Sequence, residues 1–197
     1  HGVRNLVLWA SSRNIDFAAF ERLRVLGVNL VFFDRVIPGP FADYVGLDHR
    51  RAIAAILAHA ANHPPDEAVF VDLSGIDVDS NRERREAFVT GCRRRRWPHH
   101  VVSIPYDSAN DGELRRQCRS WFPRKSDRGC VVCVNDQVAL RLRPHLSGNR
   151  IYAIDGTAAA WRTGIVSYSQ PIAAMAAATV TALRRQRLEA DAWRAMQ

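Results

Sequence analysis

Polar side chains stand at the ends of several apolar, strand-like segments of this 197-residue chain. Asn135 and Asp136 follow the apolar run 129–134 and open a helix-like segment, so they stand where the carboxyl end of a strand meets the N-terminus of a helix. Open α/β proteins bind ligands there, because strand ends form a crevice and the first helical N–H groups lack partners within the helix. The pattern predicts the same position, at a strand end, for Asp34, Asp48, Asp155 and Gln170.

These strand-end residues have the hydrogen-bonding chemistry of a site for a polyhydroxylated molecule. Carboxylates accept hydrogen bonds from hydroxyl groups, and amide side chains both donate and accept them. If the strand ends converge, they form a polar cleft suited to such a ligand. Taken singly, each residue is explained better by an ordinary turn or helix cap, because Asp and Asn are common in both. The prediction of a binding site therefore rests on the whole set.

Arginines in the segment 81–88 supply the hydrogen-bond donor that such a cleft needs. The segment follows a predicted strand and the turn at Ser74 and Gly75, so its first helical turn is expected to face the same rim. One arginine pointing into the cleft would bind vicinal oxygens or a carboxylate with two parallel hydrogen bonds. The alternative is a solvated helix face on which arginines pair with glutamates at helical spacing.

The Cys-x-x-Cys spacing of Cys130 and Cys133 is also found in redox and zinc motifs. Residues three apart on a strand point to opposite sides of the sheet. A thioredoxin-type pair lies at a helix start, and a structural zinc site needs a second pair. We therefore expect these thiols, with Cys92 and Cys118, to be buried and reduced in a cytoplasmic protein, and we predict no metal site.

Composition and missing motifs exclude several other classes of protein. The net charge is +8, but Lys125 is the only lysine among 28 basic residues, which favours a compositional bias over a nucleic-acid surface as the explanation of the charge. No apolar run reaches the roughly 20 residues that span a membrane. Hydrolase, phosphate-loop, zinc-protease and dinucleotide motifs are absent from the sequence, so no catalytic residue and no cofactor is predicted. An acid/base pair of Asp34 and Asp155 is the remaining enzyme alternative.

Strand-like and helix-like segments alternate along the chain, which predicts an α/β fold with parallel sheets flanked by helices. Strands are expected at 5–9, 29–33, 44–47, 68–73, 101–104, 129–134, 150–154 and 165–168. Helices are expected at 16–26, 51–61, 81–95, 112–121, 136–142 and 171–187. Gly27 fits a helix end, Asp79 or Ser80 fits the cap of the helix at 81–95, and Pro38-Gly39-Pro40 predicts a turn.

Six segments resemble, in order and spacing, the effector-binding domain of LacI/GalR-type transcriptional regulators. They lie at 31–35, 45–52, 82–88, 134–140, 154–156 and 169–172. The most specific are Asn135-Asp136-Gln137 with the Ala-Leu pair that follows, and Ser169-Gln170-Pro171. The resemblance extends from Val3 to about Leu183. It implies a two-lobed, periplasmic-binding-protein-like fold with a small effector, usually a sugar or nucleobase, between the lobes.

The resemblance also implies roles for individual residues and boundaries for the lobes. By position, Arg84 would grip ligand oxygens, Asn135 and Asp155 would bind effector hydroxyls, and Asp34 and Gln170 would lie on the hinge side of the cleft. Residues 1–47 with 169–190 would form the N-terminal lobe, and residues 48–168 the C-terminal lobe. The family's effector domain begins with two further strand–helix units, so the N-terminal lobe is expected to be incomplete. Gly156 stands where many relatives carry a second polar residue.

The function implied is that of a ligand-sensing domain of a bacterial transcriptional regulator. A small polar effector, with a sugar as the first expectation, would bind between the lobes, and lobe closure would change the affinity for DNA. The expected partners are this effector, operator DNA through a LacI- or GntR-type headpiece absent from this chain, and a second copy in a homodimer. The expected location is the cytoplasm. The alternative is a periplasmic sugar-binding protein of a transport system.

Overall fold

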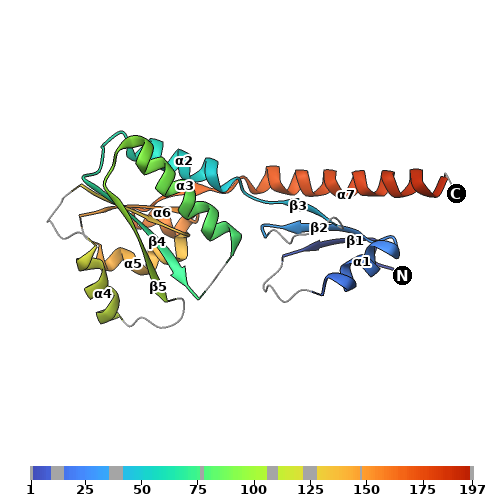
Figure 1. Ribbon diagram of the computed structural model, residues 1–197, viewed down its shortest axis with the longest axis horizontal. Coiled ribbons are helices and arrows are strands. Elements are labelled where there is room, and N and C mark those ends of the chain that lie inside the picture. The colour runs from blue at the N-terminus through green and yellow to red at the C-terminus, as the bar shows by residue number, and fades with distance from the viewer. Residues whose placement is uncertain are drawn as a thin grey trace. The chain divides into compact units, whose positions relative to one another are not determined.

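The computed structural model describes residues 2–9, 16–35, 42–75, 78–105, 111–121, 128–146 and 148–195. The chain forms two compact units, unit 1 with residues 1–47 and 171–197 and unit 2 with residues 48–170. Each unit contains its own parallel sheet (Figure 1). The second crossing between the units falls at 171, two residues beyond the expected position, so Gln170 belongs to unit 2. The turn expected at 38–40 lies outside the described residues.

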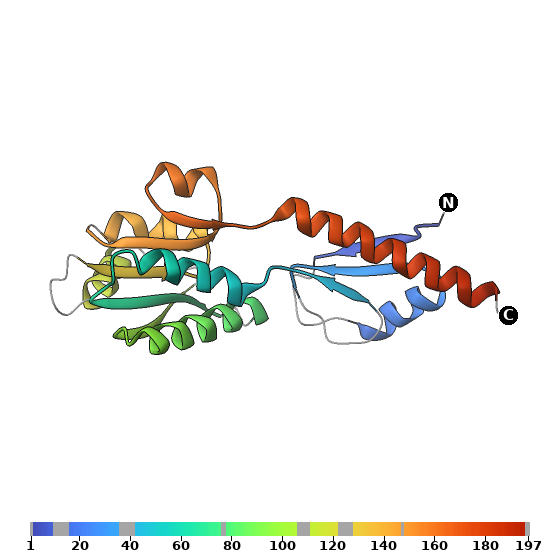
Figure 2. The ribbon, with the colours of Figure 1, turned by 90° about the horizontal axis from the view of Figure 1, so that it is seen from above.

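Unit 1 is a three-stranded parallel sheet in the order β1-β2-β3, with β1 at Asn5–Leu8, β2 at Asn29–Phe33 and β3 at Asp43–Val45. The helices α1 (Phe17–Val25) and α7 (Ile172–Ala195) lie on opposite faces of this sheet (Figures 1 and 2). The apolar run of β2 is buried because both faces are covered. Asp16 caps α1, and Gly27, with a φ of 80°, follows its end as the spacing predicts.

Unit 2 is a five-stranded parallel sheet in the order β5-β4-β6-β7-β8. Its strands are β4 (Glu67–Ser74), β5 (His99–Pro105), β6 (Gly129–Cys133), β7 (Arg150–Asp155) and β8 (Val166–Ser169). Its helices are α2 (His49–Ala60), α3 (Asp79–Arg95), α4 (Asp111–Ser120), α5 (Asp136–Leu142) and α6 (Ala158–Arg162), with a 3₁₀ turn at Arg143–His145. The helices α2 and α3 lie on one face of the sheet, and α4 and α5 lie on the other (Figure 1).

The strand order of unit 2 reverses between β4 and β6. From β4 the chain passes through α3 to the outer strand β5, and from β6 it passes through α5 to β7 on the other side. Because the two connections leave in opposite directions, a crevice opens at the carboxyl ends of β4 and β6, and ligands of open α/β sheets bind in such crevices. The fold therefore places Asn135, directly after β6, beside this switch point.

The core of unit 2 is apolar and contains the four cysteines. Cys92, Cys118, Cys130 and Cys133 are free and buried, which confirms the prediction from their spacing. Burial raises the pKa of Cys92, Cys118 and Cys130 to about 12, because a thiolate is poorly solvated there. Among the described residues, no helix is both long and apolar enough to cross a membrane.

The start of α3 differs from the prediction. The helix begins at Asp79, and Val78 occupies the cap position without any side-chain cap hydrogen bond. The prediction that Asp79 or Ser80 caps this helix is therefore wrong, because both residues lie inside the first turn. Asp79 instead pairs with Arg82. The short helix α6 and the 3₁₀ turn were not predicted, and α7 continues to Ala195.

The buried side chain of Gln186 fastens α7 to the sheet of unit 1. Its Oε1 accepts hydrogen bonds from the backbone N–H of Leu30 at 2.8 Å and from Nη1 of Arg24 at 2.7 Å. Its Nε2 donates to the carbonyl oxygen of Leu30 at 2.7 Å and to Oδ2 of Asp43 at 2.6 Å. Gln186 thus hydrogen-bonds both the N–H and the C=O of Leu30, as a residue of a neighbouring strand would.

Replacing Gln186 by leucine should destabilise unit 1, because it leaves the buried N–H and C=O of Leu30 without this partner. The expected loss is on the order of 1–3 kcal/mol for each group left unpaired, measured by urea unfolding of the full chain. Leu188, which is 70% exposed on the same helix, is the matched control. Leu188→Ala should change the unfolding free energy by less than about 0.5 kcal/mol, and an equal loss in both variants would contradict this role of Gln186.

Candidate ligand-binding site

Arg84 lies at the switch point of unit 2. It is 6% exposed, and its Nη1 donates to the carbonyl oxygen of Val134 at 2.6 Å, directly after the end of β6. Its Nε donates to Nδ1 of His49 at 3.1 Å, at the start of α2. His49 is itself buried, so this contact is shielded from water. The two bonds fix the plane of the guanidinium, which is the requirement for directed recognition of oxygen atoms.

Asp155 and Gln170 meet at the carboxyl ends of β7 and β8. Nε2 of Gln170 donates to Oδ1 of Asp155 at 2.9 Å, and the backbone N–H of Asp136 donates to Oδ2 at 3.3 Å. Burial raises the pKa of Asp155 above its ordinary value, while these two hydrogen bonds and the positive charge of Arg84 act in the opposite direction. The carboxyl, the amide and the arginine thus belong to one electrostatic cluster, which we call the Arg84 cluster.

The backbone at Asp155 has an unusual conformation. Its φ is 145°, a region that residues other than glycine rarely adopt. Gly156 follows with a φ of 74°, and a Cβ atom there would lie 2.6 Å from the Cα of Ser169. Strained backbone of this kind persists only where the surroundings hold it, and it is concentrated at binding sites. The glycine at position 156 is therefore required by the close approach of β8.

Asn135 and Asp136 have structural roles in this arrangement. Oδ1 of Asn135 accepts from the backbone N–H of Val138 at 2.9 Å and so caps α5. Asp136 is 1% exposed, and its carboxylate accepts from the N–H of Thr157 at 2.7 Å, from the Thr157 hydroxyl at 2.8 Å and from the Ser167 hydroxyl. Asn135 is half-buried, and the hydrogen bond to its amide oxygen leaves the two N–H groups of that amide as its donors toward a ligand.

Asp34 lies in unit 1, at the end of β2, where its φ is 66°. Its Oδ2 accepts from Nε1 of Trp9 at 3.2 Å, and the guanidinium carbon of Arg35 lies 4.5 Å from the centroid of the Trp9 ring. Trp9 follows β1 and is 57% exposed. Since β1 and β2 are parallel neighbours, the carboxyl edge of unit 1 presents an aromatic ring beside a carboxylate, an arrangement suited to stacking on a sugar face.

The structure brings three of the five predicted residues into one cluster. Arg84, Asp155 and Gln170 interact, Asn135 lies next to them as a helix cap, and Asp34 belongs to the other unit. Asp48, the remaining strand-end residue, caps α2 through the N–H of Arg51. Sequence reasoning missed His49 and Trp9. Their sequence signals were weak: Trp9 is the last residue of the strand predicted at 5–9, and His49 directly follows the strand-end residue Asp48. In the described part of the chain, no group of three or more His, Cys, Asp or Glu side chains could hold a metal ion.

Solved structures share this architecture. A LacI transcriptional regulator from a Rhodococcus species matches 93% of this chain with 70% of its own, at 18% identity and a TM-score of 0.72. A sugar-binding regulator of the LacI family from Escherichia coli, solved with phosphate, matches 93% with 69% of its own chain, at 12% identity and a TM-score of 0.70. The sugar-binding protein of a sugar ABC transporter from Bacillus halodurans matches 94% with 68% of its own chain, at 13% identity and a TM-score of 0.76.

These likenesses show the class of fold. The chain has the periplasmic-binding-protein-like α/β fold that effector domains of LacI-type regulators and sugar-binding proteins share. This confirms the fold implied by the sequence resemblance. No protein-family model and no curated protein sequence matches the chain.

Replacing Gly156 by alanine should destabilise unit 2 through its packing against Ser169. Gly164 is a matched control, because it has the same φ of 74° but open space where its Cβ would be. Gly164→Ala should lose about 1–2 kcal/mol from the left-handed conformation alone. Gly156→Ala should lose more, because the backbone of β8 must also move. Equal losses in urea unfolding would mean that the contact with Ser169 has no effect.

Replacing Asp155 by asparagine should remove one contribution to the pH dependence of stability. The pKa of this carboxyl is raised in the folded state, so as the pH rises above the ordinary value of 3.8 the unfolded chain ionises first and folding loses stability. Once the folded carboxyl has also ionised, the loss stays constant. In urea unfolding, the stability of Asp155→Asn relative to the parent should therefore be higher at pH 7 than at pH 3. If the free energy of unfolding of the variant, taken relative to the parent at the same pH, were lower at pH 7 than at pH 3, the pKa of Asp155 would not be raised by folding.

Proposed function

We propose that this chain is the effector-sensing domain of a bacterial transcriptional regulator and that its effector is a small polar molecule such as a sugar. The observation that carries the proposal is the Arg84 cluster at the carboxyl edge of the sheet of unit 2. It combines a fixed guanidinium, a carboxyl with a raised pKa and an amide beside a topological switch point.

The chemistry of the Arg84 cluster suits a ligand with several hydroxyl groups. Asp155 accepts hydrogen bonds, Gln170 donates and accepts them, and Arg84 donates them in a fixed plane. In the free protein Gln170 and Asp155 bind each other, which holds both polar groups until a ligand competes for them. Asn135 and, from unit 1, Asp34 with Trp9 are the further residues proposed to contact the effector.

The four cysteines favour a regulator over an exported protein. All four are free, buried thiols, and unpaired cysteines are typical of reducing compartments such as the cytoplasm, where DNA is bound. The proposal has three further parts. The lobes close on the effector, a headpiece binds operator DNA, and the protein assembles as a homodimer. In that scheme the effector can bias DNA affinity only as far as it prefers one lobe arrangement over the other.

The alternative function is solute capture for a transport system. The similarity to the sugar-binding protein from Bacillus halodurans, with a TM-score of 0.76, supports it. The gene that encodes this chain discriminates between the two functions. A DNA-binding headpiece upstream of the chain favours the regulator, and a secretory signal favours the transport protein.

A thermal-shift screen against pentoses, hexoses, sugar phosphates, uronic acids and purines tests the Arg84 cluster. A ligand of this site should stabilise the parent chain, because it binds the folded state only. Arg84→Lys keeps the charge but loses the planar fork, and Gln170→Ala removes the amide. Each should weaken binding by about 1–3 kcal/mol, because groups of the ligand are left unpaired.

Arg50→Ala is the control for these variants. Arg50 is exposed on α2, next to His49, and has no part in the Arg84 cluster. It should leave ligand affinity unchanged. A ligand that binds Arg84→Lys and Gln170→Ala as tightly as the parent would remove the Arg84 cluster from the binding site.

A further inference from the structure

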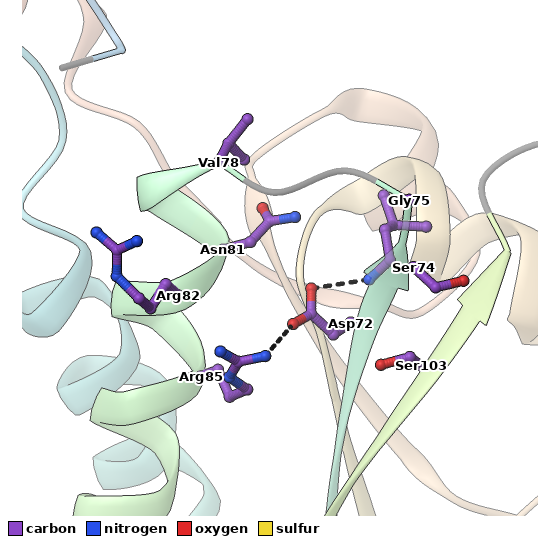
Figure 3. A pocket seen from close by; sticks show the side chains of 9 residues that line it. Asp72, Ser74, Gly75, Val78, Asn81, Arg82, Arg85 and Ser103 are labelled. Carbon is purple, nitrogen blue, oxygen red and sulfur yellow. Dashed lines mark hydrogen bonds and ion pairs between the residues drawn. The ribbon is translucent and has the colours of Figure 1, made fainter. Parts of the chain in front are cut away.

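A cavity of about 490 Å³ lies in unit 2 between the first turns of α3 and the carboxyl ends of β4 and β5. This volume is within the range of small-molecule sites. Figure 3 shows α3 along one side of the cavity and the two strands along the other. Its polar lining comes from Asp72, Ser74, Asn81, Arg82, Arg85 and Ser103. None of these residues belongs to the Arg84 cluster.

The floor of the cavity is polar and fixed. Asp72 of β4 and Ser103 of β5 are register partners in neighbouring parallel strands, so their side chains leave the same face of the sheet. Oδ1 of Asp72 accepts from the backbone N–H of Leu73 at 2.8 Å, and Oδ2 pairs with Nη1 of Arg85 at 3.4 Å. The Asp72 side chain is 7% exposed, so the carboxylate is held in place below the opening.

Asn81 supplies the side-chain amide of the cavity lining. It is 9% exposed and lies in the first turn of α3. In Figure 3 its amide points across the cavity toward Ser74 and Gly75, away from the body of α3. An amide that faces a cavity offers two N–H donors and one oxygen acceptor to a molecule that enters it.

The charges around the cavity are balanced. Arg85 pairs with Asp72, and Arg82 pairs with Asp79 in the first turn of α3. An anion placed here would meet the carboxylate of Asp72 at close range, and a cation would meet two guanidinium groups. A neutral ligand avoids both repulsions. The amide of Asn81 and the hydroxyls of Ser74 and Ser103 donate and accept hydrogen bonds, which matches hydroxyl groups.

We propose that this cavity is a second ligand site, which binds a neutral polyhydroxylated molecule, such as a sugar ring or a cyclic polyol, through the amide of Asn81. Asp72 accepts from ligand hydroxyls, Arg85 donates to them, and Ser103 completes the floor. This site goes beyond the proposed effector site and does not depend on it, because α3 directs Asn81 and Arg85 to this cavity and Arg84 to Val134.

NMR titration of the ¹⁵N-labelled full chain tests the proposal. The probes are D-glucose, D-ribose and myo-inositol, with inorganic phosphate as the charged comparison. At least one neutral probe should shift the side-chain amide signals of Asn81 and the backbone N–H signals of Ser74 and Ser103, and the shifts should saturate. Asn81→Ala should weaken that binding about tenfold, which corresponds to the loss of one well-formed hydrogen bond. Asn62→Ala, an exposed asparagine at the end of α2, should leave it unchanged.

Gln170→Ala separates this site from the effector site. It should weaken a ligand of the Arg84 cluster and leave the shifts at Asn81 intact. Loss of both together would show that the cavity is only an extension of the effector site and would overturn the proposal. Saturating shifts from phosphate alone would overturn the neutral ligand class. No shift from any neutral probe in large excess, or equal affinity in the Asn81→Ala variant, would overturn the site itself.

Discussion

The buried carboxylate of Asp136 is the interaction on which the ligand-facing edge of unit 2 depends. A carboxylate removed from water is tolerated only when hydrogen bonds replace its hydration. Asp136 receives them from the backbone and hydroxyl of Thr157 and from the hydroxyl of Ser167, and it stands at the positive N-terminus of α5. These donors belong to the cap of α6 and to β8, so one side chain joins three segments that are distant in sequence. The backbone N–H of Asp136 also donates to Asp155, whose φ is 145°.

Two aspartates at one sheet edge therefore have opposite tasks. Asp136 accepts its side-chain hydrogen bonds from Thr157 and Ser167, within the protein itself. Asp155 is less well served, since burial outweighs its two hydrogen bonds and the charge of Arg84 and raises its pKa. Groups that are held at some expense to stability are concentrated at functional sites. This contrast in environment, and not the residue type, distinguishes a scaffold carboxylate from a ligand-facing one.

Much of the fold could be predicted from the sequence because its strands are apolar runs and most of its helices have clear periodicity or caps. The segments at 29–33 and 136–142 have the predicted bounds. The five-residue helix α6 is too short to produce a periodic pattern. The start of α3 could not be predicted either, because Val78 at the cap position has no side chain that can cap a helix.

The sequence predicted which strand-end residues could form the candidate site. It did not predict which of them bind one another and which cap a helix. Nothing local links Arg84 to His49, which is 35 positions earlier in the chain. The use of Asn135 as a cap follows from the backbone at one helix start, and the place of Asn81 on a cavity wall becomes visible only when β4, β5 and α3 are assembled. Such pairings are set by tertiary packing, which residue spacing does not encode.

The two cysteines of β6 can report when the sheet of unit 2 opens. Cys130 and Cys133 are fully buried in a strand that has β4 on one side and β7 on the other, and burial raises the pKa of both thiols. An alkylating reagent reaches them only when the middle of the sheet comes apart, because only then are the sulfurs exposed and able to ionise. The rate at which these thiols are alkylated therefore reports how often the centre of the sheet opens. A ligand that binds at the sheet edge and stabilises the sheet should lower this rate.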